Sequence, residues 1–362
     1  MNTENNNFDN IKNNFDNEEE DQVGGGDSVP GQTSSIGNIG PEPVPSSFQR
    51  YKTFNPELQD YEMFISWYKK VRNFNLKTGE RISVRSIVRK DALAKFLDEG
   101  DANLIEGIID LEGCGIDELN EYAIVYIGKN DESRERSQRR DLASQLNAAS
   151  SIFEQNKSIN KEPQLPKGIK YIYMKKKQIE DADVDQTQIS QIHSQYKKLL
   201  KVFGWQDSDI EALIENSNID LVVDFNNNPP QVLASGIAET AELQVSSHKF
   251  KIVELTEAVV HPIARGSGLY HFITQKQLYR AFIDHGVNLA FGESNLDQNS
   301  RGVLYVAAKN GRKPGNIWEY KGRKYSVKVL EAHVPAGGSE YSNFLPTYIT
   351  KEKYEESLRR ES

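Results

Sequence analysis

The sequence predicts an α+β protein whose C-terminal half forms a mixed β-sheet with flanking helices. Two observations support this: strand and helix patterns alternate regularly from Gly168 onward, and apolar residues before that point recur mainly at helical spacing. The chain of 362 residues is long enough for two domains, because single cores usually stop growing before that length. We therefore divide it into a disordered acidic tail (1–48), a small mostly helical domain (49–146), a linker (147–167) and a mixed-sheet domain (168–350).

The net charge of −9 belongs largely to the tail. Residues 1–50 contain nine acidic residues against Lys12 and Arg50, and few apolar groups offset the entropy of ordering them, so we expect disorder there. The remaining chain is nearly neutral and has no basic face, so no nucleic-acid partner is indicated. The tail and the helical domain are the candidate regions for a protein partner, which the sequence does not identify.

The sequence also indicates in which cellular compartment the protein is expected. Cys114 is the lone cysteine, so an intrachain disulfide framework is excluded. The first residues, MNTENNNFDN, lack the basic start and apolar run of a signal peptide, and no window resembles a membrane-spanning run. We therefore expect a soluble, cytoplasmic protein with no membrane partner.

Helical spacing dominates the segment 49–146. Asn55-Pro56 suits a helix start, because Asn caps helices and Pro is tolerated in the first turn. Apolar residues then recur at helical intervals over 58–71, 87–97 and 104–111, and IDELNEYAIVYIG (116–128) ends in a strand pattern. This predicts a mostly helical domain of unknown role.

The patterns after Gly168 are more regular. Strands are expected at 169–174, 219–225, 231–239 and 248–260, with helices at 189–203 and from a capping box at Ser208–Glu211 between the first two strands. After the fourth strand come a glycine turn, a helix (269–284), a strand (287–294), a helix (299–309) and a last strand (324–334).

The glycine turn carries the most specific signal. In Arg265-Gly-Ser-Gly268-Leu-Tyr270, together with the element order, the chain resembles the GNAT superfamily of acyl-CoA-dependent N-acyltransferases. That family's signature is Arg or Gln, two residues, Gly, one residue, then Gly or Ala: Arg265 and Gly268 meet it, and Tyr270 departs from it. The resemblance covers about residues 168–334 and implies a GNAT-like fold with acetyl-CoA, or another acyl-CoA, as acyl donor.

Elementary chemistry explains this pattern. A helix start leaves backbone N–H groups unpaired and carries partial positive charge, so a diphosphate can lie against it where glycine leaves clearance. The resemblance implies that backbone groups of the strand end pair with the pantetheine arm, whereas N–H groups of the turn hold the diphosphate. The implied cofactor-binding residues are Val259, Val260, His261, Arg265, Gly266, Ser267, Gly268, Leu269, Tyr270 and Asn299.

Acylation of an amine requires a base for the ammonium proton and an acid for the leaving thiolate. The resemblance implies a carboxylate base on the fourth strand, and Glu254 and Glu257 are the candidates; strand alternation puts them on opposite faces. A cation anchor or a surface charge is the alternative role for either. The resemblance also implies a tyrosine acid on the helix after the fifth strand, and Tyr305 is the candidate; a core tyrosine is the alternative.

The acceptor is less well defined. The run ELTEAVVHPIARGSGL is similar to the matching stretch of bacterial β-lysine N-acetyltransferases, which favours a small amine or amino acid, with Glu254, Glu257 and Glu293 available to receive a cation. The six histidines show no metal-binding spacing, so no metal is expected.

These residues predict an N-acyltransferase that moves an acyl group, in the first instance acetyl, from acyl-CoA to a primary amine. Two alternatives stay open. Tyr270 could block the diphosphate site and leave a non-catalytic interaction protein with a degenerate fold, or the domain could use another acyl donor.

Overall fold

The computed structural model describes residues 54–58, 60–76, 81–100, 102–130, 142–155, 164–179, 183–203, 205, 207–296, 301–333 and 341–361. The predicted disordered tail (1–48) and residues 156–163 of the expected linker lie outside these ranges. Within them, no helix has both the length and the apolar character needed to cross a membrane.

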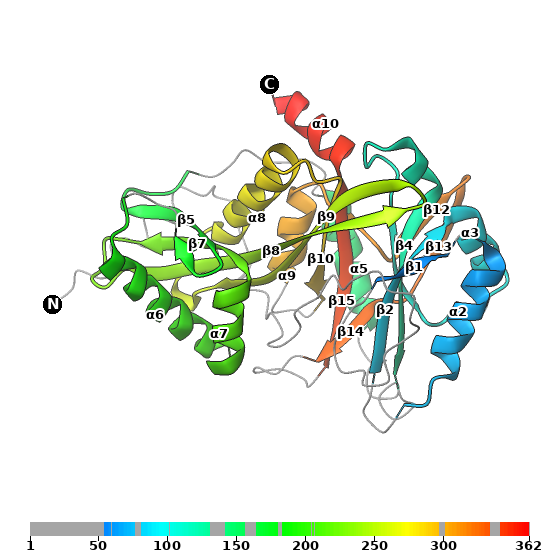
Figure 1. Cartoon of the computed structure of the whole chain (residues 1–362), viewed down its shortest axis with the longest axis horizontal. Coiled ribbons are helices and arrows are strands. Elements are labelled where there is room, and N and C mark those ends of the chain that lie inside the picture. Colours follow the sequence, from blue (N-terminus) through cyan, green and yellow to red (C-terminus); the bar gives the residue numbers. More distant parts are fainter. Residues whose placement is uncertain are drawn as a thin grey trace.

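A nine-stranded mixed sheet forms the centre of the molecule (Figure 1). Its order is β11-β15-β10-β9-β8-β7-β5-β6, with β14 also paired to β15. Among the described strands of this sheet, only β9 and β10 pair in parallel, so the predicted mixed sheet is confirmed. The strands are β5 (Ile169–Lys175), β6 (Gln178–Ile179), β7 (Asn218–Asp224), β8 (Gln231–Val245), β9 (His248–Val260), β10 (Leu289–Asn295), β11 (Lys313–Pro314), β14 (Leu330–His333) and β15 (Tyr341–Thr350).

Helices cover both faces of this sheet, which we call front and back. The front carries α6 (Gln186–Val202) and α7 (Asp207–Asn216), packed on apolar residues of β5, β7 and β8. The back carries α5 (Leu142–Gln155), α8 (Leu269–Tyr279), α9 (Arg301–Lys309) and α10 (Lys351–Glu361). The predicted flanking helices are thus confirmed.

Two local interactions fix the ends of these helices. Asp185 and Gln188 form a capping box at the start of α6, whereas the box expected at Ser208 is wrong because Ser208 lies inside α7. Beyond α8, in the π-helical turn η3 (Arg280–Asp284), the Arg280 guanidinium makes a two-point ion pair of 2.6 and 2.7 Å with buried Asp220 of β7. This pair anchors the end of α8 to the sheet.

The N-terminal segment departs from the mostly helical prediction. Its described residues form a four-stranded sheet of order β1-β2-β4-β3, with two α-helices and the short 3₁₀ helix η1 (Asp117–Glu121). Its other elements are β1 (Phe54–Leu58), α2 (Tyr61–Asn73), β2 (Arg81–Arg89), α3 (Lys90–Asp98), β3 (Ile105–Asp110) and β4 (Tyr122–Asn130).

The prediction failed for identifiable reasons. The helix expected at Asn55-Pro56 is wrong because β1 occupies these residues, and α2 starts later with the Asp60 carboxylate accepting from the Met63 N–H at 2.8 Å. The third expected helix is β3, whose residues 105–109 are all buried. A strand buried on both faces gives a continuous apolar run that spacing alone cannot distinguish from a helix.

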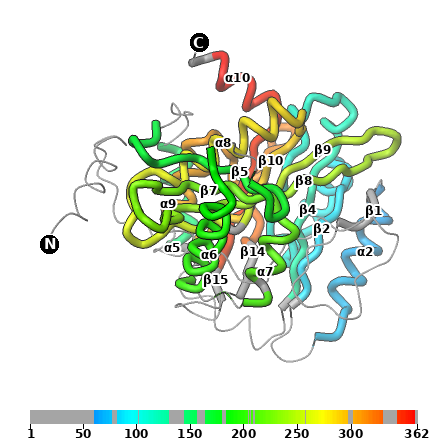
Figure 2. The backbone as a smooth tube through the Cα atoms, turned by 60° about the vertical axis from the view of Figure 1, so that its left-hand side comes forward, coloured from blue at the N-terminus to red at the C-terminus, as the bar shows by residue number. Residues whose placement is uncertain are grey.

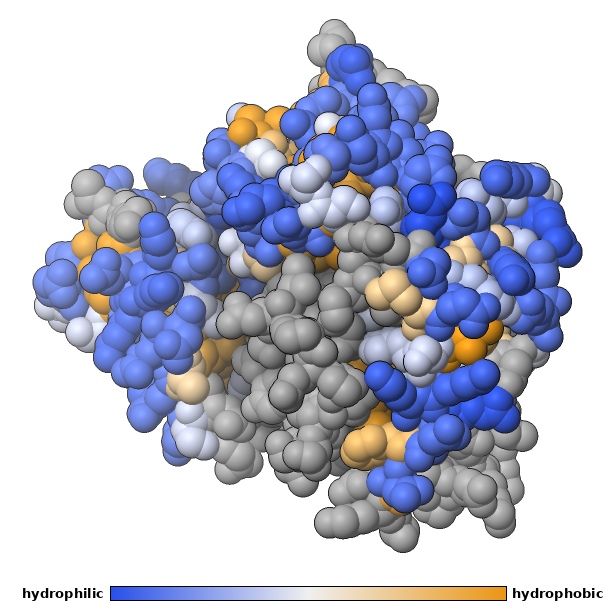
Figure 3. All heavy atoms as spheres, turned by 45° about the vertical axis from the view of Figure 1, so that its right-hand side comes forward, coloured by the Kyte–Doolittle hydropathy of each residue, from blue (hydrophilic) through white to orange (hydrophobic). Residues whose placement is uncertain are grey.

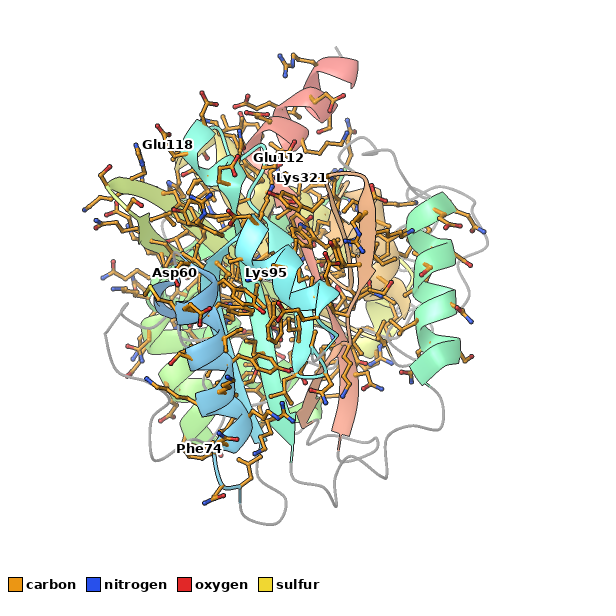
Figure 4. The ribbon with its side chains drawn as sticks, turned by 90° about the vertical axis from the view of Figure 1, so that its right-hand side faces the viewer. Asp60, Phe74, Lys95, Glu112, Glu118 and Lys321 are labelled. Carbon is orange, nitrogen blue, oxygen red and sulfur yellow. The ribbon has the colours of Figure 1, made fainter. Side chains whose placement is uncertain are left out.

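The N-terminal sheet packs on the front face of the central sheet. Figure 2 shows it beside the β8–β9 hairpin, and Figure 4 shows α2, from Asp60 to Phe74, and α3 on its outer side. The shared core contains Ile87, Ile109, Leu111, Cys114, Leu119, Tyr122, Ile124 and Tyr126 from one side and Leu243, Val245, Phe250, Ile252, Leu289, Phe291, Phe344 and Tyr348 from the other. The two sheets are therefore one packing unit over β8, β9, β10 and β15.

The segment after residue 142 also differs from expectation. The helix α5 covers the first part of the expected linker, and its Ala149 is buried against Leu296 and Leu304. The expected last strand is divided between β14 and the hairpin β12 (Ile317–Tyr320)–β13 (Arg323–Ser326), and β15 was not predicted. Over the described residues, the face turned forward in Figure 3 is mostly hydrophilic.

Candidate active site

The two parallel strands separate in the middle of the sheet. They pair from Leu289–Ile252 to Gly292–Leu255 and no further, although β9 continues to Val260 and β10 to Asn295. Beyond this point β9 stays paired with β8, and β10 with β15. Beyond Leu255 and Gly292 the facing backbone edges are therefore not paired with each other. We call this break in the ladder the slot, with its closed end at Leu255 and Gly292.

A bulge in β9 accompanies the separation. Between the pairs Ile237–Thr256 and Ser235–Val259, β9 contains one more residue than β8. The His261 N–H donates to the Leu233 carbonyl at 2.7 Å, and hydrogen-bonded pairs alternate along an antiparallel ladder, so the Val260 N–H and C=O face the slot. The resemblance implied Val259, Val260 and His261 as partners of the pantetheine arm, and Val260 is thus the one whose backbone is directed to the slot.

The open end of the slot leads to the glycine turn. Gly266 and Gly268 have φ of 74° and 72°, a region that favours glycine, and Gly268 precedes the first residue of α8. The first α-helical hydrogen bond runs from Phe272 to Gly268, so the N–H groups of the first turn have no partner within the helix. A Cβ on Gly266 would meet nothing within 4 Å.

Side chains of the turn lie around this helix start. The Arg265 guanidinium lies 5.8 Å from the Phe203 ring, and its Nε has no hydrogen-bond partner. Ser267 is buried and its hydroxyl donates to the Ala264 carbonyl. The His261 ring accepts from the Ile263 N–H at 3.3 Å, and burial together with Arg265 lowers the pKa of His261. A neutral imidazole there acts as a cap for the turn.

Tyr270, which departs from the signature of the resembled family, lies in the first turn of α8. Its ring packs against the apolar cluster between α8 and the sheet, which includes Leu269, Phe272 and Val260. Burial raises the pKa of Tyr270, and the nearby Arg312 opposes this rise. The aromatic ring therefore contributes to the packing of α8.

Arg312 occupies the closed end of the slot on the back. Its Nη2 donates to the Thr347 carbonyl at 3.1 Å and lies 2.7 Å from where a Cβ on Gly292 would be. That Cβ would also lie 2.4 Å from the Leu255 carbonyl oxygen. Glycine at 292 is thus required both by the last strand pair and by the guanidinium.

On the front, the predicted base Glu254 is buried and ion-paired. The Arg85 Nη1 of β2 donates to its carboxylate at 3.1 Å, and both side chains are at most 3% exposed. The Arg85 guanidinium lies 5.4 Å from the ring centres of both Tyr126 and Phe291. The N-terminal sheet therefore covers the closed end of the slot from the front.

A second carboxylate, Glu239, lies across from Glu254. The two residues are direct partners in the β8–β9 ladder, and Glu239 is only partly buried. Burial and the Glu254 charge raise the pKa of Glu239 to about 7, with Arg85 acting in the opposite direction. Of this pair, one carboxylate is neutralised by an arginine and the other can gain or lose a proton near neutral pH.

The other predicted site residues lie on β9, α9 and β10 or outside the described residues. Glu257 lies in the bulged part of β9, but its side chain is outside the described residues, as is all of Asn299. Tyr305 is half-buried on α9, with the Lys309 ammonium 4.4 Å from its ring centre. Glu293 is the first β10 residue beyond the separation and, by alternation from Phe291, is on the front. Their functional roles stay predictions.

Three site residues were missed by sequence reasoning: Arg85, Glu239 and Arg312. Glu239 stands at the end of a predicted strand, fifteen positions before Glu254, and a hairpin register would have placed the two opposite each other. Arg85 and Arg312 had no usable signal, because each belongs to a segment brought to the slot only by tertiary packing.

A separate cavity of about 690 Å³ lies near α10, beside Glu112, Trp318 and Glu352. Its β15 residues Tyr348 and Thr350 pair with the Leu289 end of β10, away from the separation. It is therefore distinct from the slot. Among the described side chains, no group of three or more His, Cys, Asp or Glu is placed to hold a metal ion.

No protein-family model and no curated protein matches the sequence. The chain is similar to GNAT-family acetyltransferases over about half of its length. A GNAT-family acetyltransferase from Bacillus anthracis has 12% identity and a TM-score of 0.31, covering 47% of this chain and 92% of that one. NAA60 from Arabidopsis thaliana, solved with acetyl-CoA, has 10% identity and a TM-score of 0.33, covering 50% and 99%. Mutant forms of the spermidine/spermine N-acetyltransferase SpeG from Vibrio cholerae have 10% identity and a TM-score of 0.31, covering 54% and 100%.

Proposed function

We propose that the protein is an N-acyltransferase that uses an acyl-CoA donor and a primary amine acceptor. The observation that carries this proposal is the slot between β9 and β10, which opens toward the glycine turn and the start of α8. Backbone groups in the middle of a sheet need partners, and here β9 and β10 do not supply them to each other. An extended chain with amide groups, such as the pantetheine arm of CoA, is a suitable partner.

The turn matches the other end of such a donor. The free N–H groups and partial positive charge of the α8 start favour a diphosphate, and Arg265 adds a cation nearby. The resemblance noted in the sequence assigns Arg265 to Tyr270 to this role. The packing of Tyr270 into the α8 cluster supports a donor site that the ring does not obstruct.

The reaction would proceed by attack of the amine nitrogen on the thioester carbon. A base removes the ammonium proton, the C–S bond breaks, and the thiolate takes a proton as CoA leaves. We assign Glu239 as this base in place of Glu254, since Arg85 already holds the Glu254 carboxylate. Tyr305 stays the candidate acid.

The amine acceptor is proposed to bind on the front of the central sheet. Glu239 lies there, Glu293 is placed there by alternation, and their acidic character favours a cationic amine. A small amine or amino acid is the proposed class.

The test is amine-dependent release of the CoA thiol from acetyl-CoA, measured with polyamines and basic amino acids as first acceptors. We expect release that requires both amine and protein, together with a mass increase of the amine by one acyl group. Release that is the same without amine would contradict the proposal.

A matched pair of variants tests the assigned base. Glu239→Gln removes the carboxylate beside Glu254, whereas Glu242→Gln removes an exposed carboxylate from the same strand. Loss of a general base typically costs about 10² to 10⁴ in rate. We expect that loss for Glu239→Gln only; equal rates for the two variants would remove Glu239 from the mechanism.

A further inference from the structure

Two buried arginines flank the closed end of the slot, and they differ in one respect. Arg85, on the front, has the carboxylate of Glu254 at 3.1 Å. Arg312, on the back, is 5% exposed, and among the described residues no carboxylate accepts a hydrogen bond from it. Its Nε has no hydrogen-bond partner. The charge of Arg312 is therefore uncompensated by any described acid.

The position of Arg312 is fixed by the end of α9. The Gly311 N–H donates to the Ala308 carbonyl at 2.9 Å and the Arg312 N–H to the Ala307 carbonyl at 3.0 Å, with Gly311 at φ 71°. These bonds form a Schellman motif, which ends the helix and turns the chain toward the sheet. The guanidinium is thereby held against Gly292 by ordered backbone.

A buried charge without a partner is costly. Taking an ion out of water carries a penalty of several kcal/mol even after relaxation, and proteins normally offset it with an opposite charge. The start of α8 adds positive potential on the same side of the sheet, because its N-terminus points to the turn at the open end. A ligand that brings a negative charge to the closed end would compensate Arg312.

The geometry of the slot indicates which part of a donor would reach Arg312; this step rests on the function proposed above. With the diphosphate at the start of α8 and pantetheine beside Val260, the donor points along β9 toward Leu255. Five residues of strand correspond to roughly 16 Å at about 3.3 Å per residue. The atoms that arrive last at the closed end are those of the acyl tail.

We propose that the preferred donor carries an acyl group ending in a carboxylate, as succinyl-CoA does, and that Arg312 binds this carboxylate. A guanidinium and a carboxylate match in a planar, two-point arrangement of charge-assisted hydrogen bonds. The Nε and the other N–H groups that do not bond to Thr347 supply the donors. An acetyl group would end in a methyl group and leave the charge uncompensated.

The test compares the affinities of the full-length protein for CoA, acetyl-CoA and succinyl-CoA by calorimetry. We expect succinyl-CoA to bind at least about tenfold more tightly than acetyl-CoA, a difference of about 1.4 kcal/mol. In Arg312→Met the ratio should fall to about one, and Arg312→Lys should give an intermediate ratio because it keeps the charge without the planar fork. Arg323→Met, which removes an exposed arginine, should keep the wild-type ratio.

The outcomes separate this inference from the proposed function. Equal affinity of the wild-type protein for acetyl-CoA and succinyl-CoA overturns the inference but not the proposed function. An equal loss of both affinities in Arg312→Met also overturns the inference alone, because it would indicate a role of Arg312 toward the thioester or in folding. Failure to bind any CoA species overturns both. If Arg312→Met does not fold, the wild-type comparison still decides.

Discussion

Arg85 of β2 and Glu254 of β9 form an ion pair of 3.1 Å that joins the two sheets. Both side chains are almost fully buried, and the guanidinium lies 5.4 Å from the ring centres of Tyr126 and Phe291. The pair therefore links the N-terminal sheet to the closed end of the slot, which makes this sheet part of the site.

Breaking this pair from one side should be strongly destabilising. Arg85→Met or Glu254→Met leaves the other charge buried and alone, which typically costs about 3–5 kcal/mol. The double variant removes both charges and should recover most of the loss. Urea unfolding of the two single variants and the double variant measures the coupling.

The exposed pair Lys249–Glu242, at 2.8 Å in the β8–β9 hairpin that carries Glu254, is the matched control. Its loss should change stability little, because exposed ions stay solvated. Additive effects of Arg85→Met and Glu254→Met would contradict the importance of the buried pair.

The raised pKa of Glu239 predicts a pH dependence of stability. Its pKa is about 7 in the folded chain against an ordinary value of 4.5, so the folded state binds more protons between these values. Stability should therefore fall as pH rises from about 4.5 to 7, by at most about 3.5 kcal/mol at about 1.4 kcal/mol per pKa unit. Glu239→Gln should remove this fall, as measured by urea unfolding at several pH values.

Glu242→Gln is the control for this pH series, because Glu242 is exposed on the same strand. It should keep the wild-type slope in that pH window. A slope in Glu239→Gln equal to that of the wild-type protein would show that another group causes the fall.

Tyr270 should matter for packing more than for donor binding. Tyr270→Phe keeps the ring in the α8 cluster and should unfold close to the wild-type temperature, whereas Tyr270→Ala should lose about 2–4 kcal/mol through the cavity it leaves. Neither change should strengthen acetyl-CoA binding. A gain of about tenfold in affinity for Tyr270→Ala would mean that the ring obstructs the site.

The elements around the slot were predictable because their local signals agree. β9 is a long β-branched run that ends at a proline, and the turn after it needs glycine at positive φ at both Gly266 and Gly268. Local propensity, turn chemistry and periodicity thus indicate the same structure. This consistency made the strand, turn and helix visible in the sequence.

β15 was missed because of Pro346 in its middle, since a proline usually argues against a central strand. The structure accommodates it in a gap between two partners: β14 pairs with residues 341–344 and β11 with 347–348. The missing N–H of Pro346 therefore removes no hydrogen bond from the pairing of β15 with β14 or with β11. Such a gap depends on the tertiary arrangement and leaves no local signal.

Arg85 and Arg312 were not predictable for a related reason. In the alternating β2 strand an arginine looks like a solvent-facing residue, and only the packing of the second sheet buries it. Arg312 follows a helix end, where basic residues are common. The charges that define the closed end of the slot thus come from segments distant in sequence.

The most direct test of the acyl-donor site uses two glycines in open space. Gly266 (φ 74°) and Gly286 (φ 60°) would each place an alanine Cβ with no atom within 4 Å, so the backbone strain of the two substitutions is similar. Only Gly266 lies at the start of α8, where the diphosphate is proposed to bind.

Calorimetric binding of CoA and acetyl-CoA to the wild-type protein, Gly266→Ala and Gly286→Ala is therefore the deciding measurement. The account predicts binding by the wild-type protein, similar binding by Gly286→Ala, and affinity at least about tenfold lower for Gly266→Ala. No binding of either ligand by the wild-type protein, or equal affinities in the two variants, would contradict a donor site at this turn.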